Sequence, residues 1–413
     1  MPRANKFRAG LLLSTLVLGT AAGPVFDVAW RKTDHDRVGK NVSAYFEAFA
    51  EKKGVADAWE DFSSSVEKLE KKYPNVLTYT EDWERVFRAE AISHCKARPK
   101  KAKIVEETFD FRGDKIDTAL HFPKTYSTKG DPYPFFLIAC DANTDPKAQL
   151  EEWANATVRD TAILCAVRMP SNVELIDKLG DESGPGGITF LMASFGTLKA
   201  DYAIDMNRVF IAGHGEGARA ALVTAAAFPH QFAGVVARNG GADVKATNFL
   251  SLPTLWLASG EAGTKFEEAA GEAGMENVTV SGSASDDEIA AWIDGKSRDA
   301  YPLHVKFEPV NERSLATRWI AMSGASPDAE SKLEAKVDRE ANTITIDAEN
   351  IVSVNLYLND VLVDLSQPVK VVINGRTEEA LIARNQRTMV DLQYYGGDWG
   401  RVFTATESFD ITE

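Results

Sequence analysis

The chain has 413 residues, of which 44% are hydrophobic and 26% are charged, and its formal net charge is −15. These proportions are typical of a soluble globular protein, and the length suits two or three domains. An acidic surface repels polyanions, so nucleic acid is excluded from the expected partners, as are anionic membranes. A protein, a small molecule or a glycan remains as the expected ligand.

The first 23 residues have the layout of a secretory signal peptide. Three basic residues precede an apolar run over 9–18, and small residues follow as far as Ala22 and Gly23. This pattern predicts cleavage near Ala22 or Gly23 and export to the periplasm, the cell envelope or the exterior. An uncleaved N-terminal membrane anchor is the first alternative, because low polarity continues to residue 26 and roughly 18 apolar residues can span a bilayer. A cytoplasmic protein is the second.

The three cysteines, Cys95, Cys140 and Cys165, are too few for a disulfide framework. Cys140 and Cys165 each lie in an apolar, strand-like run, so we expect them to be buried thiols. A single bridge in an oxidising compartment is the alternative. It would join Cys140 to Cys165 if their two strands are neighbours.

Residues 34–98 predict a helical segment. Apolar side chains recur near helical spacing over 42–53, 56–72 and 80–91. A basic linker follows over 98–103, and we expect it to be solvated.

Between residues 104 and 300, short apolar strands alternate with helical stretches. This alternation predicts a mainly parallel sheet with helices on both faces. The expected strands are 104–111, 115–122, 135–140, 162–167, 209–212, 234–237, 254–258 and 278–280. The expected helices are one that ends near 158, then 187–202, 218–228, 265–273 and 287–293.

Residues 303–413 predict a separate all-β, sandwich-like domain, because the helical patterns stop after Tyr301-Pro302. The dipeptides Asn359-Asp360 and Asn374-Gly375 predict tight hairpin turns. The expected strands are 304–310, 317–322, 333–337, 343–346, 352–358, 361–364, 369–373 and 377–383.

One segment has the strand–turn–helix context of a nucleophile elbow. It reads Gly213-His214-Gly215-Glu216-Gly217 and lies between a predicted strand and an alanine-rich helix. The residues two before and two after the nucleophile must be small in such a turn, so that helix and strand can approach closely. Gly213 and Gly217 meet that need. Gly215 stands at the nucleophile position and has no side chain.

In this context, residues 133–243 resemble the secreted bacterial α/β-hydrolases of the esterase, polyhydroxybutyrate-depolymerase and prolyl-oligopeptidase-like type. The matching pieces, besides the elbow, are Tyr133-Pro134 before an apolar strand, Trp153-Ala154 before the next, and Asp205-Met206-Asn207-Arg208-Val209. Some members carry a C-terminal β-domain entered through a Tyr-Pro like the one at 301–302. The resemblance implies an α/β-hydrolase fold for 104–300 and a serine-hydrolase triad.

The resemblance also implies working residues from which this chain departs. The nucleophile position holds Gly215, the acid position holds Gly263, and the general-base position holds Ser283. The turn that helps to form the oxyanion hole begins Cys140-Asp141, and an aspartate there would repel a developing oxyanion. We therefore expect no catalytic residue, no cofactor and no metal ion.

The elbow could still have a different chemistry. Cys140, Asp141, His214, Gly215 and Glu216 form a predicted vestigial pocket. Asp141, His214 and Glu216 could form an acid–base or metal cluster, although their spacing matches no strong metal signature.

Two histidines follow the elbow in the sequence. His230 comes after Phe228-Pro229 at a helix end, where we expect a surface side chain. His304 begins the first strand of the β-domain, and without a nucleophile it has no proton to accept.

The leading hypothesis is a catalytically degenerate, exported hydrolase-like protein that binds, scaffolds or regulates. Its β-domain is the expected contact surface, since ligand contacts often lie on sandwich loops. One alternative is an active ester or peptide hydrolase with an unconventional site near the elbow. The other is an envelope-associated carbohydrate-binding or structural protein.

Overall fold

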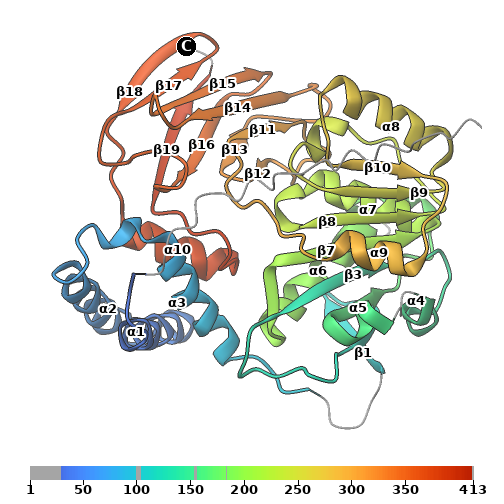
Figure 1. Ribbon diagram of the computed structural model, residues 1–413, viewed down its shortest axis with the longest axis horizontal. Coiled ribbons are helices and arrows are strands. Elements are labelled where there is room, and N and C mark those ends of the chain that lie inside the picture. Colours follow the sequence, from blue (N-terminus) through green and yellow to red (C-terminus); the bar gives the residue numbers. More distant parts are fainter. Residues whose placement is uncertain (1–28, 99–103, 153–155, 183, 412–413) are drawn as a thin grey trace, which may run out of the picture.

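The computed structural model describes residues 29–98, 104–152, 156–182 and 184–411. The predicted signal or anchor, most of the basic linker and Trp153-Ala154 lie outside these residues. No helix within the described residues combines the length and the apolarity needed to cross a bilayer. Figure 1 shows a helical group, a part built on one large sheet, and a C-terminal part with two smaller sheets.

The large sheet has eight strands in the order β1-β2-β4-β3-β7-β8-β9-β10. β2 runs antiparallel to β1 and β4, and the other neighbouring strands are parallel. This order, with β4 placed between β2 and β3, is that of the α/β-hydrolase fold, as the sequence predicts. The strands are β1 Ile104–Phe111, β2 Asp114–His121, β3 Tyr133–Ala139, β4 Ile163–Val167, β7 Ile204–His214, β8 Gly234–Arg238, β9 Thr254–Leu257 and β10 Val278–Ser281.

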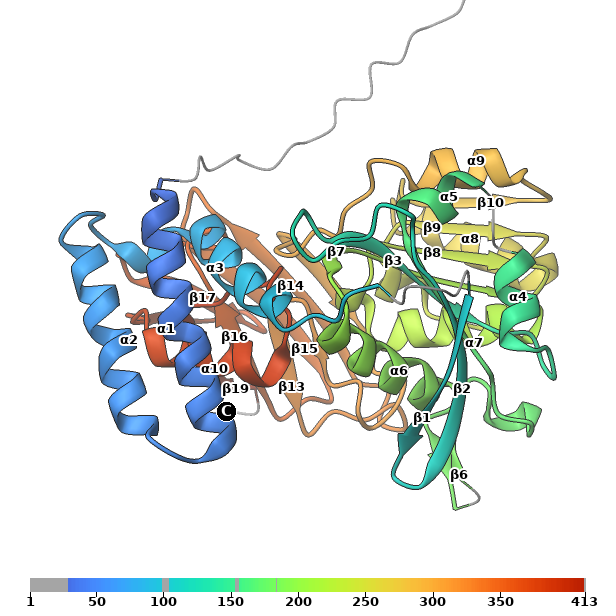
Figure 2. The ribbon, with the colours of Figure 1, turned by 90° about the horizontal axis from the view of Figure 1, so that it is seen from below.

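Helices cover both faces of this sheet (Figures 1 and 2). One face packs against α6, α7 and α8, and the other against α4, α5 and α9. The helices are α4 Pro146–Glu152, α5 Ala156–Thr161, α6 Gly187–Asp201, α7 Glu216–Ala227, α8 Gly260–Glu272 and α9 Asp286–Ile293. Short additions are the β5 Gly180–Asp181 and β6 Gly184–Pro185 hairpin and the 3₁₀ turns η2 Val173–Leu175, η3 Pro229–Gln231 and η4 Ala246–Phe249.

Side chains alternate between the two faces of the sheet, and this alternation determines on which face each of Cys140 and Cys165 lies. Cys140 belongs to the core on one face of the sheet, together with Phe136 and Ile138. Cys165 belongs to the core on the other face, with Leu137. Their strands are neighbours, but the thiols point to opposite faces, and all three cysteines are free. The alternative of a Cys140–Cys165 bridge is therefore wrong.

The helical group consists of α1 Lys32–Glu51, α2 Val55–Glu70, η1 Val76–Thr78 and α3 Thr80–Ser93. Its core is aromatic: Tyr45, Phe62 and Trp83 are almost completely buried. The group packs against α10 (Gln386–Gly396), a helix from the far end of the chain (Figure 2), where Phe49 and Tyr394 have ring centroids 4.8 Å apart.

The C-terminal part has two sheets that enclose a core of their own. One has the order β11-β14-β15-β17-β18 and the other β12-β13-β16-β19. Asn374-Gly375 forms the hairpin turn between β17 and β18, as predicted. The strands are β11 His304–Phe307, β12 Ala316–Thr317, β13 Ile320–Ser323, β14 Lys332–Asp338, β15 Thr343–Glu349, β16 Ser353–Leu358, β17 Val369–Ile373, β18 Arg376–Ala380 and β19 Ala405–Asp410.

Three predictions for this part are wrong. Helices do not stop after residue 302, because α10 spans Gln386–Gly396 and Asn385 caps its first turn through its side-chain oxygen. Residues 361–364 form a turn rather than a strand, and Asn359 is not in a hairpin. The Asn359 side chain accepts hydrogen bonds from the N–H groups of Val361 and Leu362, and the side chains of Leu362 and Val363 are buried in the core.

A buried ion pair joins the parts. Arg298 donates two hydrogen bonds of 2.8 Å to the two carboxylate oxygens of Asp398, and their side chains are 0% and 6% exposed. Arg298 also donates to the His230 carbonyl and to the Asn207 side chain, both in the large-sheet part. Arg401 binds the same carboxylate at 2.8 Å. Burial raises the pKa of Asp398, but Arg298 and Arg401 outweigh burial and hold the pKa well below its usual range.

Replacement Asp398→Asn should lower the free energy of unfolding by about 3–5 kcal/mol, because it leaves buried guanidinium groups without their counter-charge. Urea denaturation at pH 7 measures this. The matched control is Asp286→Asn, which removes the carboxylate of the solvent-exposed pair with Arg238 and should cost at most about 1 kcal/mol. Equal losses of unfolding free energy in the two variants would contradict the conclusion that the buried pair joins the parts.

Candidate functional site

The elbow lies where β7 ends and α7 begins. Gly215 connects them with φ 57° and ψ −124°, a backbone conformation that favours glycine. Its N–H donates to the Arg238 carbonyl on the neighbouring β8 at 2.9 Å. This is the sharp, strained strand-to-helix turn from which a hydrolase with this fold presents its nucleophile.

The glycines on either side of the turn are sterically required. A Cβ atom at Gly213 would lie 2.6 Å from the backbone nitrogen of Ala218, and one at Gly217 would lie 2.6 Å from the carbonyl oxygen of Cys140. Both distances are well inside van der Waals contact. The close approach that the Gly-x-x-x-Gly spacing predicts is thus present, and it packs α7 onto the sheet.

A carboxylate occupies the two backbone donors beside the elbow. Asp141 Oδ1 accepts hydrogen bonds from the N–H of Glu216 at 2.8 Å and from the N–H of Ala142 at 2.9 Å. In an α/β-hydrolase the oxyanion hole consists of the N–H after the nucleophile and an N–H from the loop after β3. Those are the positions of Glu216 and Ala142 here. The positive end of the α7 dipole adds to the attraction.

Asp141 and Gly215 depend on each other for space. A Cβ atom at Gly215 would lie 2.6 Å from the carboxyl carbon of Asp141. Gln149 accepts from the Asp141 N–H at 2.9 Å and holds the backbone of the loop in place. A side chain at position 215 is therefore incompatible with the Asp141 carboxylate where it lies.

The polar residues of the predicted pocket divide into two groups. His214 Nδ1 lies 3.6 Å from Asp141 Oδ2, and His214 Nε2 lies 2.8 Å from the Asn239 side-chain nitrogen. Glu216 is instead paired with Arg219 at 3.1 Å, one turn along α7. Across the described ranges, no group of three or more His, Cys, Asp or Glu side chains is placed to hold a metal ion.

The positions matched to the acid and the base hold no titratable side chain. Gly263 is buried in α8, where a Cβ atom would meet the Ser259 hydroxyl. Ser283 is exposed in the loop between β10 and α9, and its carbonyl accepts from the Ser281 hydroxyl at 3.1 Å. Glu261, near the acid position, is 81% exposed and pairs with Lys265.

Cys140 is the remaining candidate nucleophile of the predicted pocket. It is completely buried, and burial raises the pKa of its thiol far above the usual value. A thiol that stays protonated at neutral pH is a poor nucleophile.

Neither histidine that follows the elbow contacts it. The expectation that His230 is a surface residue is wrong: it is buried, and burial together with Arg401 and Arg318 lowers its pKa well below the usual value. It is buried because the C-terminal part, which contributes Arg318 and Arg401, packs against η3. His304 lies in the C-terminal part, 2.8 Å from Glu334.

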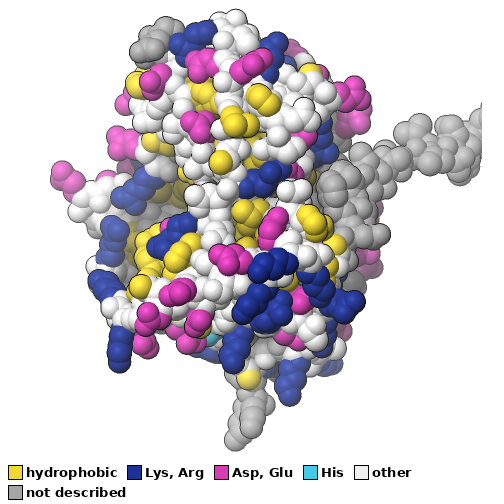
Figure 3. All heavy atoms as spheres, turned by 90° about the vertical axis from the view of Figure 1, so that its left-hand side faces the viewer, with side chains coloured by type: hydrophobic (Ala, Val, Ile, Leu, Met, Phe, Trp, Pro, Cys, Tyr) yellow, Lys and Arg dark blue, Asp and Glu magenta, His cyan; other side chains and the backbone are white. Residues whose placement is uncertain are grey.

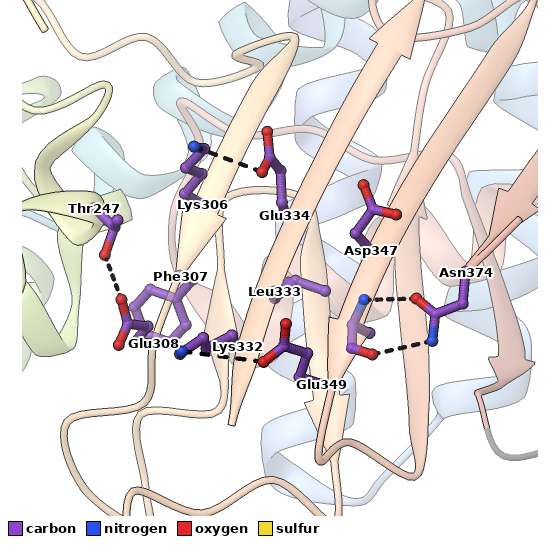
Figure 4. Close-up of a pocket in the computed structure, with 11 residues that line it drawn as sticks. Thr247, Lys306, Phe307, Glu308, Lys332, Leu333, Glu334, Asp347, Glu349 and Asn374 are labelled. Atoms are coloured by element: carbon purple, nitrogen blue, oxygen red, sulfur yellow. Dashed lines mark hydrogen bonds and ion pairs between the residues drawn. The ribbon is translucent and has the colours of Figure 1, made fainter. Parts of the chain in front are cut away.

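A second candidate site is a groove of about 580 Å³ over β11, β14 and β15, bounded by Thr247 of η4 (Figure 4). Its charged side chains are largely paired, as Lys306 is with Glu334 and Lys332 with Glu349. Burial raises the pKa of Glu334, but hydrogen bonds from Lys336 and His304 have a larger opposite effect. The pKa is therefore lowered to about 2. A ligand in this groove would have to compete with these pairs. Sequence reasoning missed the groove, whose only signal is alternating Lys and Glu on strands.

The mutual dependence of Asp141 and Gly215 can be measured as a coupling. Gly215→Ala should destabilise the protein by about 2–3 kcal/mol, through a clash with Asp141 and backbone strain. In an Asp141→Gly background the same change should cost at least about 1 kcal/mol less, since the clash is gone. Urea denaturation of both single variants and the double variant gives the coupling. Additive effects would contradict the described contact.

A scan of protein-family models and a search of curated proteins find no match to this chain. Among solved structures, a thermostable esterase is similar at 19% identity and a TM-score of 0.40, over 48% of this chain and 64% of that one. The chain thus spans less than two thirds of that esterase. A ferulic acid esterase is similar at 16% identity and a TM-score of 0.37, over 46% and 94%. Est1E from Butyrivibrio proteoclasticus is similar at 12% identity and a TM-score of 0.34, over 46% and 95%.

Proposed function

We propose that this α/β-hydrolase-fold protein does not catalyse hydrolysis and acts by binding a protein, a small molecule or a glycan. The observation that carries the proposal is the position of Asp141, whose carboxylate accepts from both backbone donors of the oxyanion hole. A substrate carbonyl oxygen would have to displace this carboxylate and then develop its own negative charge beside it.

The magnitudes support loss of activity rather than slow catalysis. Removing one oxyanion donor from a working hydrolase costs roughly 10²–10³ in kcat. Removing a triad member leaves only about 10³–10⁴ over the reaction in water, which the oxyanion hole and substrate binding supply. With Gly215 at the nucleophile position and Asp141 on both donors, neither a nucleophile nor an oxyanion hole is available to accelerate hydrolysis.

The N-terminal pattern supports export, with a signal cleaved near Ala22 or Gly23 or retained as an anchor. On the face formed by the helical group and the C-terminal sheets, Lys and Arg are interspersed with Asp and Glu (Figure 3). Such a surface steers ligands weakly over long distances, so recognition there would depend on local shape. A separate concave site, which would suit recognition by shape, is the groove over β11, β14 and β15.

A second candidate function is an active ester or peptide hydrolase with an unconventional site. It rests on one observation, the 3.6 Å approach of His214 to Asp141 beside the elbow. At 3.6 Å the two groups are beyond hydrogen-bond distance, and they would have to move closer to act as an acid–base pair that activates water.

Purified protein should hydrolyse 4-nitrophenyl acetate and butyrate no faster than its His214→Ala and Glu216→Ala variants, because the elbow offers no nucleophile and no free oxyanion donors. The measurement is the initial rate per mole of folded protein. Release of 4-nitrophenolate is followed by its absorbance at about 400 nm. Turnover by the wild type that disappears in His214→Ala or Glu216→Ala would overturn the proposal and establish the second candidate.

A further inference from the structure

A separate cavity of about 310 Å³ lies where η3, the β12–β13 turn and the C-terminal half of α10 meet. It is not part of the elbow. Its walls combine the charged side chains Arg318, Arg401 and Asp398 with the buried His230 and several aromatic rings. The volume is at the lower end of the range for small-molecule sites.

The charges around this cavity do not balance. Arg298, Arg318 and Arg401 contribute three guanidinium groups, while Asp398 contributes one carboxylate, which Arg298 and Arg401 already share. Arg318 donates to the carbonyls of Asp299 and Ser251, and no carboxylate in the described ranges forms an ion pair with it. Two positive charges are therefore left in excess beside the cavity.

The neighbouring groups do not supply the missing negative charge. Burial raises the pKa of Glu84, which contacts Tyr301, to about 8, so it is mostly neutral at pH 7. Asp299 lies at an exposed position, and its carboxylate compensates the charge of Arg318 only in part. Burial lowers the pKa of Arg318 to about 9; Asp299 opposes this effect more strongly than either Arg298 or Arg401 adds to it. Arg318 is thus charged at neutral pH and poorly compensated.

Arg318 is also held in an unfavourable backbone conformation. Its φ is 49°, in the left-handed region that favours glycine or asparagine, and it is 3% exposed. Such a position costs free energy, and strained residues of this kind cluster at ligand-binding sites. The turn between β12 and β13 thus places the buried Arg318 at the cavity despite this cost in free energy.

Three aromatic rings, and a buried histidine nitrogen without a partner in the described part of the chain, also line the cavity. His230 Nδ1 is buried and has no hydrogen-bond partner among the described residues. Tyr357 and Phe403, with ring centroids 5.9 Å apart, provide an apolar wall. Tyr395 lines the same cavity and is 73% exposed, so the cavity is reached from solvent past its ring.

We propose that this cavity binds a small organic carboxylate with an apolar, ring-sized body. The guanidinium of Arg318 would bind the carboxylate, and Tyr357 and Phe403 would pack against the body. The inference goes beyond the proposed function, since it requires neither the presence nor the absence of chemistry at the elbow.

Calorimetric titration of the full chain with 2-naphthoate, and with the neutral 2-naphthalenemethanol of similar size, tests this. We expect 2-naphthoate to bind at least tenfold more tightly than the alcohol, because only the anion compensates the excess positive charge. Arg318→Met should weaken 2-naphthoate binding at least tenfold and leave binding of the alcohol nearly unchanged. The matched control Arg339→Met, an exposed arginine in the β14–β15 turn, should bind 2-naphthoate like the wild type.

If Arg318→Met does not fold, Leu392→Trp serves instead, since it adds volume at a half-buried lining position of α10 and should abolish binding of both probes. Absence of 2-naphthoate binding to folded wild-type protein, equal binding of acid and alcohol, or retained binding in both variants would overturn the inference. Ester hydrolysis is measured separately: a protein that hydrolyses esters and also binds 2-naphthoate would refute the proposed function and leave this inference intact.

Discussion

The arrangement of the whole chain depends on the buried pair of Arg298 and Asp398. Arg298 follows the last helix of the large-sheet part, and Asp398 follows α10 in the C-terminal part. The helical group lies beside this pair, because Glu84 of α3 contacts Tyr301. Taking two charges out of water is costly, and the two parallel hydrogen bonds repay that cost only when the parts meet in one geometry. The pair therefore specifies how the parts fit together.

The elbow shows that turn geometry and chemistry are separable. Gly213 and Gly217 are needed so that α7 can pack on the sheet, whatever residue lies between them. That packing contributes to stability, so the turn persists without a nucleophile. The N–H groups of Ala142 and Glu216 beside the turn are partly buried and are stabilised by an acceptor. Asp141 provides one from within the chain, and the missing side chain of Gly215 leaves the space for it.

Local patterns predicted much of the fold, and long-range contacts explain most errors. The strand 104–111 agrees to the residue, because a hairpin turn with a positive φ at Gly113 limits it at one end. The α10 helix escaped prediction because its buried face is short and is completed by α1, more than 300 residues away. The burial of His230 was equally hidden, since it depends on residues of the C-terminal part, such as Arg318, that are distant in the sequence. The sequence placed Asp141 beside the elbow, but its hydrogen bond to Glu216 spans 75 positions and needs the folded sheet.

The most direct test of the account is a high-resolution crystal structure of the elbow at neutral pH. We expect the Asp141 carboxylate to lie within hydrogen-bond distance of the N–H groups of both Ala142 and Glu216, with no water or ligand oxygen between them. A structure in which Asp141 points to solvent and another oxygen occupies those two donors would contradict it, because the oxyanion hole would then be free for a substrate.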